Sequence, residues 1–403
     1  MKLSGKKLLG AVCMTSSLLW SGLTLAGMNK FENIRHVSSE ECQECHEEIY
    51  DQWKGSMHAQ STALEDPIHG TFYKAVVGKP TLEDVRTKSG KYPVCLQCHS
   101  PAAAKDKKTK LDAKVSYGEG VNCISCHTMT KFKGTKKPGG GLRLGMQAYE
   151  FSDTTLQGPK GFDSEHKKFG KKAFDAPQIA NNPGLFRTSD ACMGCHDQRP
   201  NSKNVPLCAT GDEVMAAGGS TTCQTCHMPS INGESNHSMM GGHSPSVVSK
   251  GLVMTMDTHK SGNNIQATIN IRNLLPHNFP TGAPFRNFYV KTKAYDKNGV
   301  IVWQSSNKHP MKEDKLAMMM LKLGDKGKPA PPPKATHIIS DTRLKPNETR
   351  KLNYKIPAKG VVRIKSVGYY DLLLPPIKEK FGKSIPKELL QPQKVAIVEK
   401  TIL

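Results

Sequence analysis

The stretch Cys42-Gln43-Glu44-Cys45-His46 decides how this chain is organised, because the same Cys-x-x-Cys-His pattern occurs five times among its 403 residues. The other four units are Cys95/Cys98/His99, Cys123/Cys126/His127, Cys192/Cys195/His196 and Cys223/Cys226/His227. Two thiols separated by two residues reach both vinyl groups of one porphyrin, and the histidine that follows ligates its iron. The pattern therefore predicts five c-type haems, each with two thioether bonds and one proximal histidine.

Other cysteine chemistry fits this spacing less well. Twelve cysteines would ordinarily indicate disulfides in a protein outside the cytoplasm, and one Cys-x-x-Cys pair can be half of a zinc site or a redox dithiol. Five pairs that all end in histidine argue against both alternatives. Cys13 lies in the N-terminal apolar segment, and Cys208, which belongs to no unit, is expected to be a buried, small apolar residue.

The second axial position of each iron decides what such a protein does. A histidine or methionine there gives an electron carrier, whereas an open position admits a substrate. Fifteen histidines less the five proximal ones leave ten. The candidate distal ligands, chosen by their position in the chain, are His58, His166, His237, His243 and His277. His36 and His69 are left undecided, and His259, His309 and His337 are expected to face solvent.

The first 26 residues predict a secretory signal peptide. Met1 to Lys7 include three lysines, an apolar stretch runs from Leu8 to Leu25, and the small residues Ala26 and Gly27 offer a cleavage site. Serines and threonines dilute the apolar stretch, which argues against a retained membrane anchor. We expect a mature protein that is secreted across the inner membrane and works in the periplasm or at the cell surface.

Two regions of different character follow. Residues 27–248 hold all five units and few strand patterns, so we expect a mainly helical and irregular pentahaem cytochrome domain organised by its haems. Residues 249–403 show alternating apolar runs between turn signals, which predict an all-β, immunoglobulin-like sandwich. The fold class is therefore α+β. The predicted strands lie at 265–271, 288–295, 300–303, 337–339, 350–356 and 361–369.

The intervals between the units predict how the haems are grouped. Cys95 and Cys123 are close in sequence, as are Cys192 and Cys223, whereas a longer interval separates these two sets. We expect two close haem pairs at these positions, with the haem of Cys42 joining one of them.

The charge of the chain restricts its partners. It carries 57 Lys and Arg against 35 Asp and Glu, a formal net charge of +22. No segment interleaves aromatic with basic residues, so nucleic acid is not an expected partner. A basic surface favours an acidic redox protein, an anionic substrate or an anionic membrane surface. Assembly of like chains into an oligomer or filament is left open.

Several of these stretches resemble bacterial multihaem cytochromes related to the tetrahaem electron acceptor of hydroxylamine oxidoreductase. The resemblance rests on Ser38–His46 with Trp53 and Ser56-Met57-His58, on Gly118–His127, and on Cys223–Pro229. The turn His277-Asn278-Phe279-Pro280-Thr281-Gly282 is more loosely similar to a turn of β-domains appended to such cytochromes. The resemblance implies electron transfer through packed haems, with His58, His166, His237 and His277 as distal ligands and His243 as the fifth choice.

Three functions follow from these observations. The leading hypothesis is a respiratory electron carrier rather than an enzyme, because the chain has enough histidines to saturate every iron and lacks a Cys-x-x-Cys-Lys unit. The first alternative is a multihaem oxidoreductase that acts on a small nitrogen or sulfur oxyanion at one open haem. The second is a subunit of an extracellular cytochrome filament.

Overall fold

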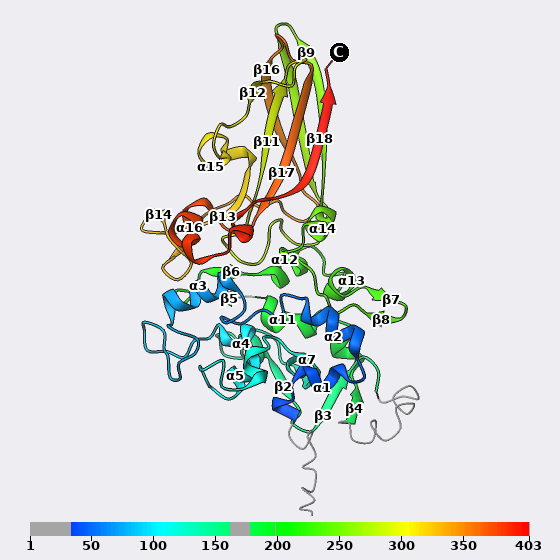
Figure 1. Ribbon diagram of the computed structural model, residues 1–403, viewed down its shortest axis with the longest axis vertical. Helices are drawn as coiled ribbons and strands as arrows, with labels where there is room; N and C mark the ends of the chain where they lie inside the picture. The colour runs from blue at the N-terminus through cyan, green and yellow to red at the C-terminus, as the bar shows by residue number, and fades with distance from the viewer. Residues whose placement is uncertain (1–33, 162–177, 198, 403) are drawn as a thin grey trace, which may run out of the picture.

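The structure, a computed structural model, describes residues 34–161, 178–197 and 199–402. The predicted signal peptide (1–26) and the candidate ligand His166 lie outside these residues. The described chain forms a lower region of short helices and an upper region of long strands, stacked along the long axis (Figure 1). This arrangement confirms the α+β fold class. Within the described ranges, no helix is both long enough and apolar enough to cross a membrane.

The lower region is built from short helices and two-stranded sheets. Its helices are α1 (Ser39–Gln43), α2 (Glu47–Lys54), α3 (Pro67–Val76), α4 (Leu96–His99), α5 (Pro101–Lys105), α6 (Val115–Gly118), α7 (Cys123–His127), α10 (Pro183–Phe186), α11 (Asp190–His196), α12 (Thr210–Ala216), α13 (Cys223–His227) and α14 (Pro245–Val248). Its strands pair as β1 (Met129–Phe132) with β2 (Tyr149–Phe151), β3 (Thr155–Gly158) with β4 (Gln178–Asn181), β5 (Arg199–Pro200) with β6 (Pro206–Cys208), and β7 (Ser230–Ile231) with β8 (Glu234–Ser235). Helices α4, α7, α11 and α13 each end at the histidine of an attachment unit.

The upper region contains two sheets. One has the strand order β16-β10-β9, made of β16 (Thr349–Pro357), β10 (Asn264–Asn273) and β9 (Leu252–Ser261). The other has the order β14-β13-β11-β17-β18, with β12 on β11 and β15 on β13. Its strands are β11 (Asn287–Tyr295), β12 (Ile301–Gln304), β13 (Met318–Asp325), β14 (Lys328–Pro329), β15 (His337–Asp341), β17 (Arg363–Asp371) and β18 (Gln393–Thr401). Two helices, α15 (Pro310–Glu313) and α16 (Pro375–Phe381), lie beside them.

The alternating apolar pattern explains why these segments form strands. On β10, Ile265, Ile269 and Ile271 are buried at every second or fourth position, so one face of the strand turns inward. These side chains share one hydrophobic core with Phe288 of β11 and Ile364 of β17, which belong to the other sheet. Every predicted strand is present, whereas four strands of the upper region were not predicted: β9, β13, the two-residue β14 and β18. The domain boundary after residue 248 stays a prediction.

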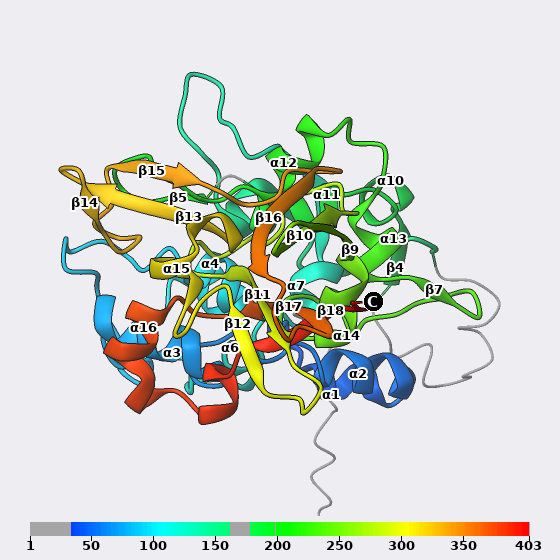
Figure 2. The same ribbon diagram turned by 90° about the horizontal axis from the view of Figure 1, so that it is seen from above.

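Two hydrophobic contacts are among those that pack the two regions against each other. Helix α3 inserts Ile68 into the core of the upper region, and the ring of Phe72 stacks on Phe285 with centroids 5.0 Å apart. The β5–β6 hairpin buries Val205 against Leu321 of β13. Seen along the long axis, β13, β14 and β15 extend to one side together with β5 (Figure 2). Both contacts tie the upper region to segments that lie next to attachment units.

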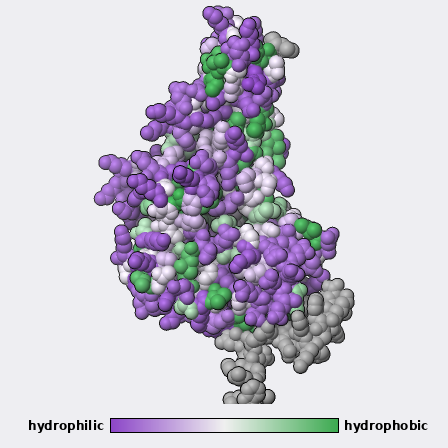
Figure 3. Space-filling view, in the orientation of Figure 1, coloured by the Kyte–Doolittle hydropathy of each residue, from purple (hydrophilic) through white to green (hydrophobic). Residues whose placement is uncertain are grey.

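The face shown in Figure 3 is predominantly hydrophilic, with small, scattered apolar areas. This surface agrees with a chain of high net charge and a mean hydropathy of −0.49. Apolar side chains are instead collected in the core of the upper region and in smaller clusters among the short helices.

Candidate haem centres

The proximal histidines of three units are held in one orientation by the backbone. The Nδ1 of His99 donates a hydrogen bond to the carbonyl of Ser61 at 2.9 Å, that of His127 to Gln157 at 2.7 Å, and that of His227 to Met240 at 2.8 Å. A carbonyl acceptor on Nδ1 fixes the tautomer and leaves the lone pair of Nε2 to bind a metal. These rings therefore fit iron ligation through Nε2.

Two candidate distal histidines lie opposite proximal ones at the separation that iron ligation needs. The ring centroids of His127 and His237 are 6.3 Å apart with an angle of 28° between the rings. His237 also donates from Nδ1 to the carbonyl of Ser235 at 2.7 Å, so its Nε2 is available. Two metal–imidazole bonds of ~2 Å place ring centroids roughly 6 Å apart. The pair therefore fits a haem iron between its rings.

His58 and His196 form a second such pair, with ring centroids 5.9 Å apart. The Nδ1 of His58 is buried and has no hydrogen-bond partner among the described residues. A buried polar atom without a partner is costly, so an unpaired ring nitrogen in this place fits a residue whose partner is a bound group.

His69, which sequence reasoning left undecided, lies against the proximal His99. Their ring centroids are only 3.9 Å apart, and the Nδ1 of each ring lies 2.9 Å from the same carbonyl, that of Ser61. The Nε2 of His69 is buried without a partner among the described residues. The donor set fits an iron, but the rings must first part by roughly 2 Å, since two ~2 Å metal–nitrogen bonds separate such rings.

The turn at His277 places a histidine of the upper region within electrostatic range of His227, the histidine of the last attachment unit. Burial lowers the pKa of His277, and a smaller contribution comes from the nearby charge of His227. Its Nδ1 donates to the carbonyl of Asn278 at 2.9 Å, while its own carbonyl accepts from the Nδ2 of the buried Asn273 at 2.8 Å. The upper region thus contributes a candidate ligand to the lower one.

Burial keeps these imidazoles neutral. It lowers the pKa of His58 to about 3 and that of His69 to about 4, and it also lowers the pKa of His127, His196 and His237. Iron binds the neutral imidazole through its lone pair, so a depressed pKa removes the competition with protons. The chemistry of the donor set therefore fits haem iron at neutral pH.

The remaining histidines have other surroundings. His243 is a candidate ligand whose pKa burial lowers to about 4, with a further contribution from Arg286, and no contact places it beside a proximal ring. His36 lies 3.1 Å from a carboxylate oxygen of Asp106. His259 and His337 are exposed on strands, whereas His309 packs against Tyr289 with ring centroids 4.6 Å apart.

Cysteines of different attachment units touch each other. Three pairs of thiols lie close enough to shift each other's pKa: Cys42 with Cys123, Cys98 with Cys195, and Cys192 with Cys223. The third contact agrees with the predicted pairing of the last two units, whereas the expected pairing of the haems at Cys95 and Cys123 stays a prediction. The first unit lies against the third although they are far apart in sequence, so sequence separation alone does not predict which units are neighbours.

Polar side chains in the resembling stretches hold the first and third units together. The carboxylate of Glu119 accepts hydrogen bonds from the backbone N–H of Ser39 at 3.0 Å and from the Nδ2 of Asn122 at 2.9 Å. The side-chain oxygen of Asn122 in turn accepts from the N–H of Ser125 at 2.9 Å and caps α7. Glu119 therefore joins the start of α1 to the start of α7, which explains the contact between Cys42 and Cys123.

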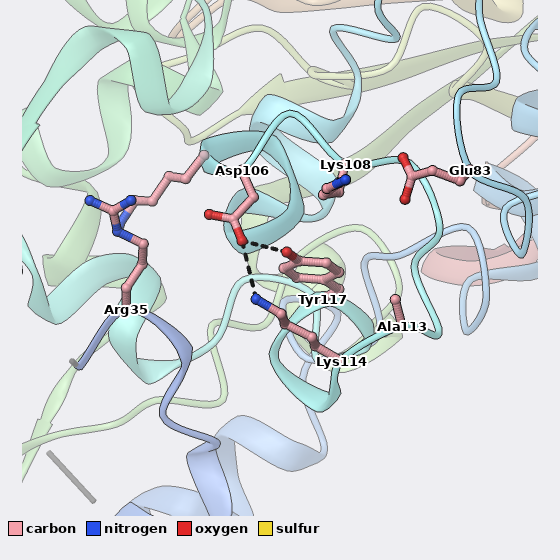
Figure 4. Close-up of a pocket in the computed structure, with 8 residues that line it drawn as sticks. Arg35, Glu83, Asp106, Lys108, Ala113, Lys114 and Tyr117 are labelled. Atoms are coloured by element: carbon pink, nitrogen blue, oxygen red, sulfur yellow. Dashed lines mark hydrogen bonds and ion pairs between the residues drawn. The ribbon is translucent and has the colours of Figure 1, made fainter. Parts of the chain in front are cut away.

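A basic cavity of about 500 Å³ lies beside these helices. Its lining residues are Arg35, Glu83, Lys105, Asp106, Lys108, Ala113, Lys114 and Tyr117. Figure 4 shows the carboxylate of Asp106 bound by Lys114 and by the hydroxyl of Tyr117. The carboxylates in the cavity are thus already partnered by residues of the chain, and no attachment cysteine or proximal histidine lines it.

Sequence reasoning left His69 undecided and gave Glu119 no role, although a local signal marks the helix of His69. Asp66 caps α3 by accepting from the N–H of Ile68 at 2.8 Å, and Pro67 is the first residue of that helix. This start signal places His69 and Tyr73 on one helix face, which the structure turns inward to His99.

Comparisons with known proteins agree with this chemistry. A family model described as cytochrome c554 and c-prime matches residues 41–128. The crystal structure of a penta-heme cytochrome c552 from Thermochromatium tepidum is 50% identical to this chain, and the match covers 92% of this chain and 100% of that one with a TM-score of 0.87. No curated protein matches.

Two further solved structures match weakly. A DUF1425 family member from Shewanella sp. pv-4 is 14% identical over 30% of this chain and 77% of that one, with a TM-score of 0.16. The sporulation control protein Spo0M from Bacillus subtilis is 9% identical over 38% of this chain and 48% of that one, with a TM-score of 0.13. These scores carry no argument about fold or function.

Proposed function

This chain belongs to the family of multihaem cytochromes c, which transfer electrons, and from that premise we propose that it is a five-haem carrier in which most irons lie between two histidines. Covalently bound haem supplies one-electron chemistry through the ferric and ferrous states of its iron. The five Cys-x-x-Cys-His units hold the haems. The alternative of a specialised enzyme needs an iron without a second protein ligand.

The contacts between thiols of different units carry this proposal. Cys192 lies against Cys223, and Cys195 lies against Cys98. These neighbours and burial raise the pKa of both thiols, and Cys126 of the third unit adds a smaller increase. The first unit joins through Cys123. Electron tunnelling falls steeply with distance, so attachment units in mutual contact support transfer along the chain of haems, with the fourth unit as the junction.

The distal ligands follow from the ring pairs. The ring pairs assign His58, His69 and His237 as the distal ligands opposite His196, His99 and His127. We further propose His277 opposite His227, because His277 is buried and lies near enough to His227 for that residue to contribute to the lowering of its pKa. Carbonyl acceptors orient the rings of His69, His237 and His277. Burial excludes water and protons from all four rings. His166 and His243 stay candidates for the remaining iron. Rigid ligation by two histidines leaves no position for a substrate, which favours a carrier.

The proposed setting is outside the cytoplasm. The lysines and apolar stretch of residues 1–26 support secretion across the inner membrane, to the periplasm or the cell surface. The net charge of +22 supports an acidic redox protein as partner in respiration, and it also suits an anionic membrane surface.

The test is the ferric EPR spectrum of the purified holoprotein, followed by carbon monoxide titration of the reduced form of the same sample. We expect low-spin signals alone and no rapid binding of the gas, because a six-coordinate iron offers no position to it. A high-spin signal together with stoichiometric gas binding would overturn the carrier proposal and favour an oxidoreductase acting on a small oxyanion.

A further inference from the structure

The turn that carries His277 is held from the lower region by one carboxylate. Glu213 lies on α12, and its side chain is only 9% exposed. Its Oε2 accepts hydrogen bonds from the backbone N–H of Asn278 at 3.1 Å and from the Oγ1 of Thr281 at 2.6 Å. Its Oε1 accepts from the Nδ2 of Asn278 at 3.1 Å. Three donors of one turn therefore converge on a single side chain.

The charge of Glu213 is balanced from the upper region. The Nη1 of Arg343 lies 2.8 Å from its Oε1, and this guanidinium is 13% exposed. Arg343 also forms a two-bond pair with Asp341, through Nε to Oδ1 and Nη2 to Oδ2, at 2.9 and 2.8 Å. A buried charge is tolerated only when it is paired and hydrogen-bonded. Glu213 satisfies this condition only while the turn and Arg343 stay docked on α12.

The place of Glu213 in the chain links it to one haem centre. Helix α12 directly precedes α13, which carries the last attachment unit and ends at His227. The residue next to His277 is Asn278, which gives Glu213 two of its hydrogen bonds. Thr210, at the start of the same helix, also meets Thr281, with 2.9 Å between their hydroxyl oxygens. The same helix therefore holds the turn against the lower region, just before the segment of chain that ends at His227.

We propose that Glu213 is the positioning residue that holds His277 as the sixth ligand of the haem attached at Cys223 and Cys226. This inference rests on the proposed ligand role of His277. The upper region then has a structural role in haem ligation, because this haem becomes six-coordinate only when the two regions are docked. Without Glu213, the turn loses the acceptor of three hydrogen bonds at once and the imidazole leaves the iron.

The test compares four holoprotein variants by ferric EPR, carbon monoxide stoichiometry and thermal unfolding. His277→Ala defines the signature of the lost ligand: one haem in five becomes high-spin and binds the gas. Glu213→Ala is expected to reproduce that signature, and Glu213→Gln, which keeps an acceptor oxygen, to show it only in part. Glu348→Ala is the matched control, because it removes an upper-region carboxylate that is paired with Arg350 at 2.7 Å and accepts from the N–H of Lys345, but that accepts from none of the three turn donors held by Glu213.

The possible outcomes distinguish a failure of the positioning role of Glu213 from a failure of the ligand role of His277. If His277→Ala gives one high-spin haem while Glu213→Ala stays low-spin, Glu213 has no positioning role and the ligand assignment stands. If His277→Ala leaves every haem low-spin, the ligand assignment fails and the inference fails with it. Should Glu213→Ala not fold, Glu213→Gln decides alone: a carbon monoxide stoichiometry equal to that of Glu348→Ala overturns the inference. A high-spin fraction above that control, at equal thermal stability, supports it.

Discussion

Gly120 lies so close to the segment of His58 that no larger residue fits. A β-carbon there would lie 2.3 Å from the carbonyl oxygen of His58 and 2.8 Å from that of Ala59, and the φ angle of Gly120 is +69°. We expect Gly120→Ala to lower the free energy of unfolding by about 1–3 kcal/mol more than the left-handed backbone alone explains, and to shift the EPR signal of the haem opposite His58.

The control for this prediction is Gly134→Ala. Gly134 has a similar φ angle of +76°, but nothing lies within 4 Å of the position that a methyl group would take there. This change should cost only the left-handed backbone penalty of about 1–2 kcal/mol. Equal losses of stability in the two variants, measured by denaturant unfolding, would show that the contact with His58 is unimportant.

Lys105 gives the protein a pH-dependent stability. Its Nζ donates to the Oγ1 of Thr128 at 3.1 Å and lies 3.8 Å from the ring centroid of Phe151, and burial lowers its pKa from 10.5 to about 8. Between these values the unfolded chain binds a proton that the folded chain does not. The free energy of unfolding therefore rises with pH between the two pKa values, and Lys105 contributes at most about 3 kcal/mol to this rise.

The variant Lys105→Met should lose this rise and be more stable than the wild type below pH 8, where the buried ammonium is unfavourable. Lys108→Met, which removes another lysine from the same cavity wall, is the control and should keep the rise. Denaturant unfolding at intervals from pH 7 to 10 makes the comparison. A parallel pH profile in the Lys105 variant and the wild type contradicts the prediction.

The sequence predicts each proximal ligand directly, whereas it predicts the distal ligands only as a set of candidates without their partners. A Cys-x-x-Cys-His unit is local, so its histidine is fixed within five residues of chain. The partner of each proximal histidine comes from a distant segment: His237 meets His127, and His69 meets His99. His69 stayed undecided because only the packing of α3 shows which way its ring turns. His58 and His237 were chosen by their position and lie opposite proximal rings.

At the scale of elements, Glu119 connects α1 to α7. We expect Glu119→Ala to lower the free energy of unfolding by about 1–3 kcal/mol, because the N–H of Ser39 and the amide of Asn122 lose their acceptor in a partly buried place. The first and third attachment units should also separate, which spectroelectrochemical titration would detect as a change in the potentials of two haems.

Glu119→Gln keeps one acceptor oxygen and should show a smaller loss. Glu150→Ala removes an exposed glutamate on β2 and serves as the control for the loss of a charge. If the Glu119 and Glu150 variants unfold at the same denaturant concentration, the link between the two helices contributes no stability.

Three of the strands that the sequence predicted, β10, β11 and β17, are buried on one whole face. Those that it missed have different patterns of burial. Strands β9 and β18 lie at the ends of their sheets and bury few side chains, so their apolar residues do not alternate clearly. Strand β13 begins with Met318-Met319-Met320-Leu321, a continuous apolar run that does not distinguish a strand from a helix. The order of the strands depends on contacts far apart in sequence.

At the scale of the whole molecule, the net charge of +22 should govern encounter rates. Reduction of the ferric protein by an anionic reagent such as dithionite should slow several-fold as the ionic strength rises from about 10 to 150 mM, because salt screens the attraction. Reduction by a cationic reagent should accelerate over the same range. Stopped-flow kinetics test both, and rates independent of salt would show that the haem edges are reached from a neutral surface.

The contact between Cys42 and Cys123 also bears on how the protein matures. Free thiols this close are readily joined by an oxidant, and the same holds for Cys98 with Cys195 and Cys192 with Cys223. A chain that closed before receiving its cofactors would therefore risk cross-bridges between its binding units, each of which would block two of them. The porphyrins must therefore be attached to the cysteines before the chain becomes compact. Covalent attachment thus determines the order of the folding steps.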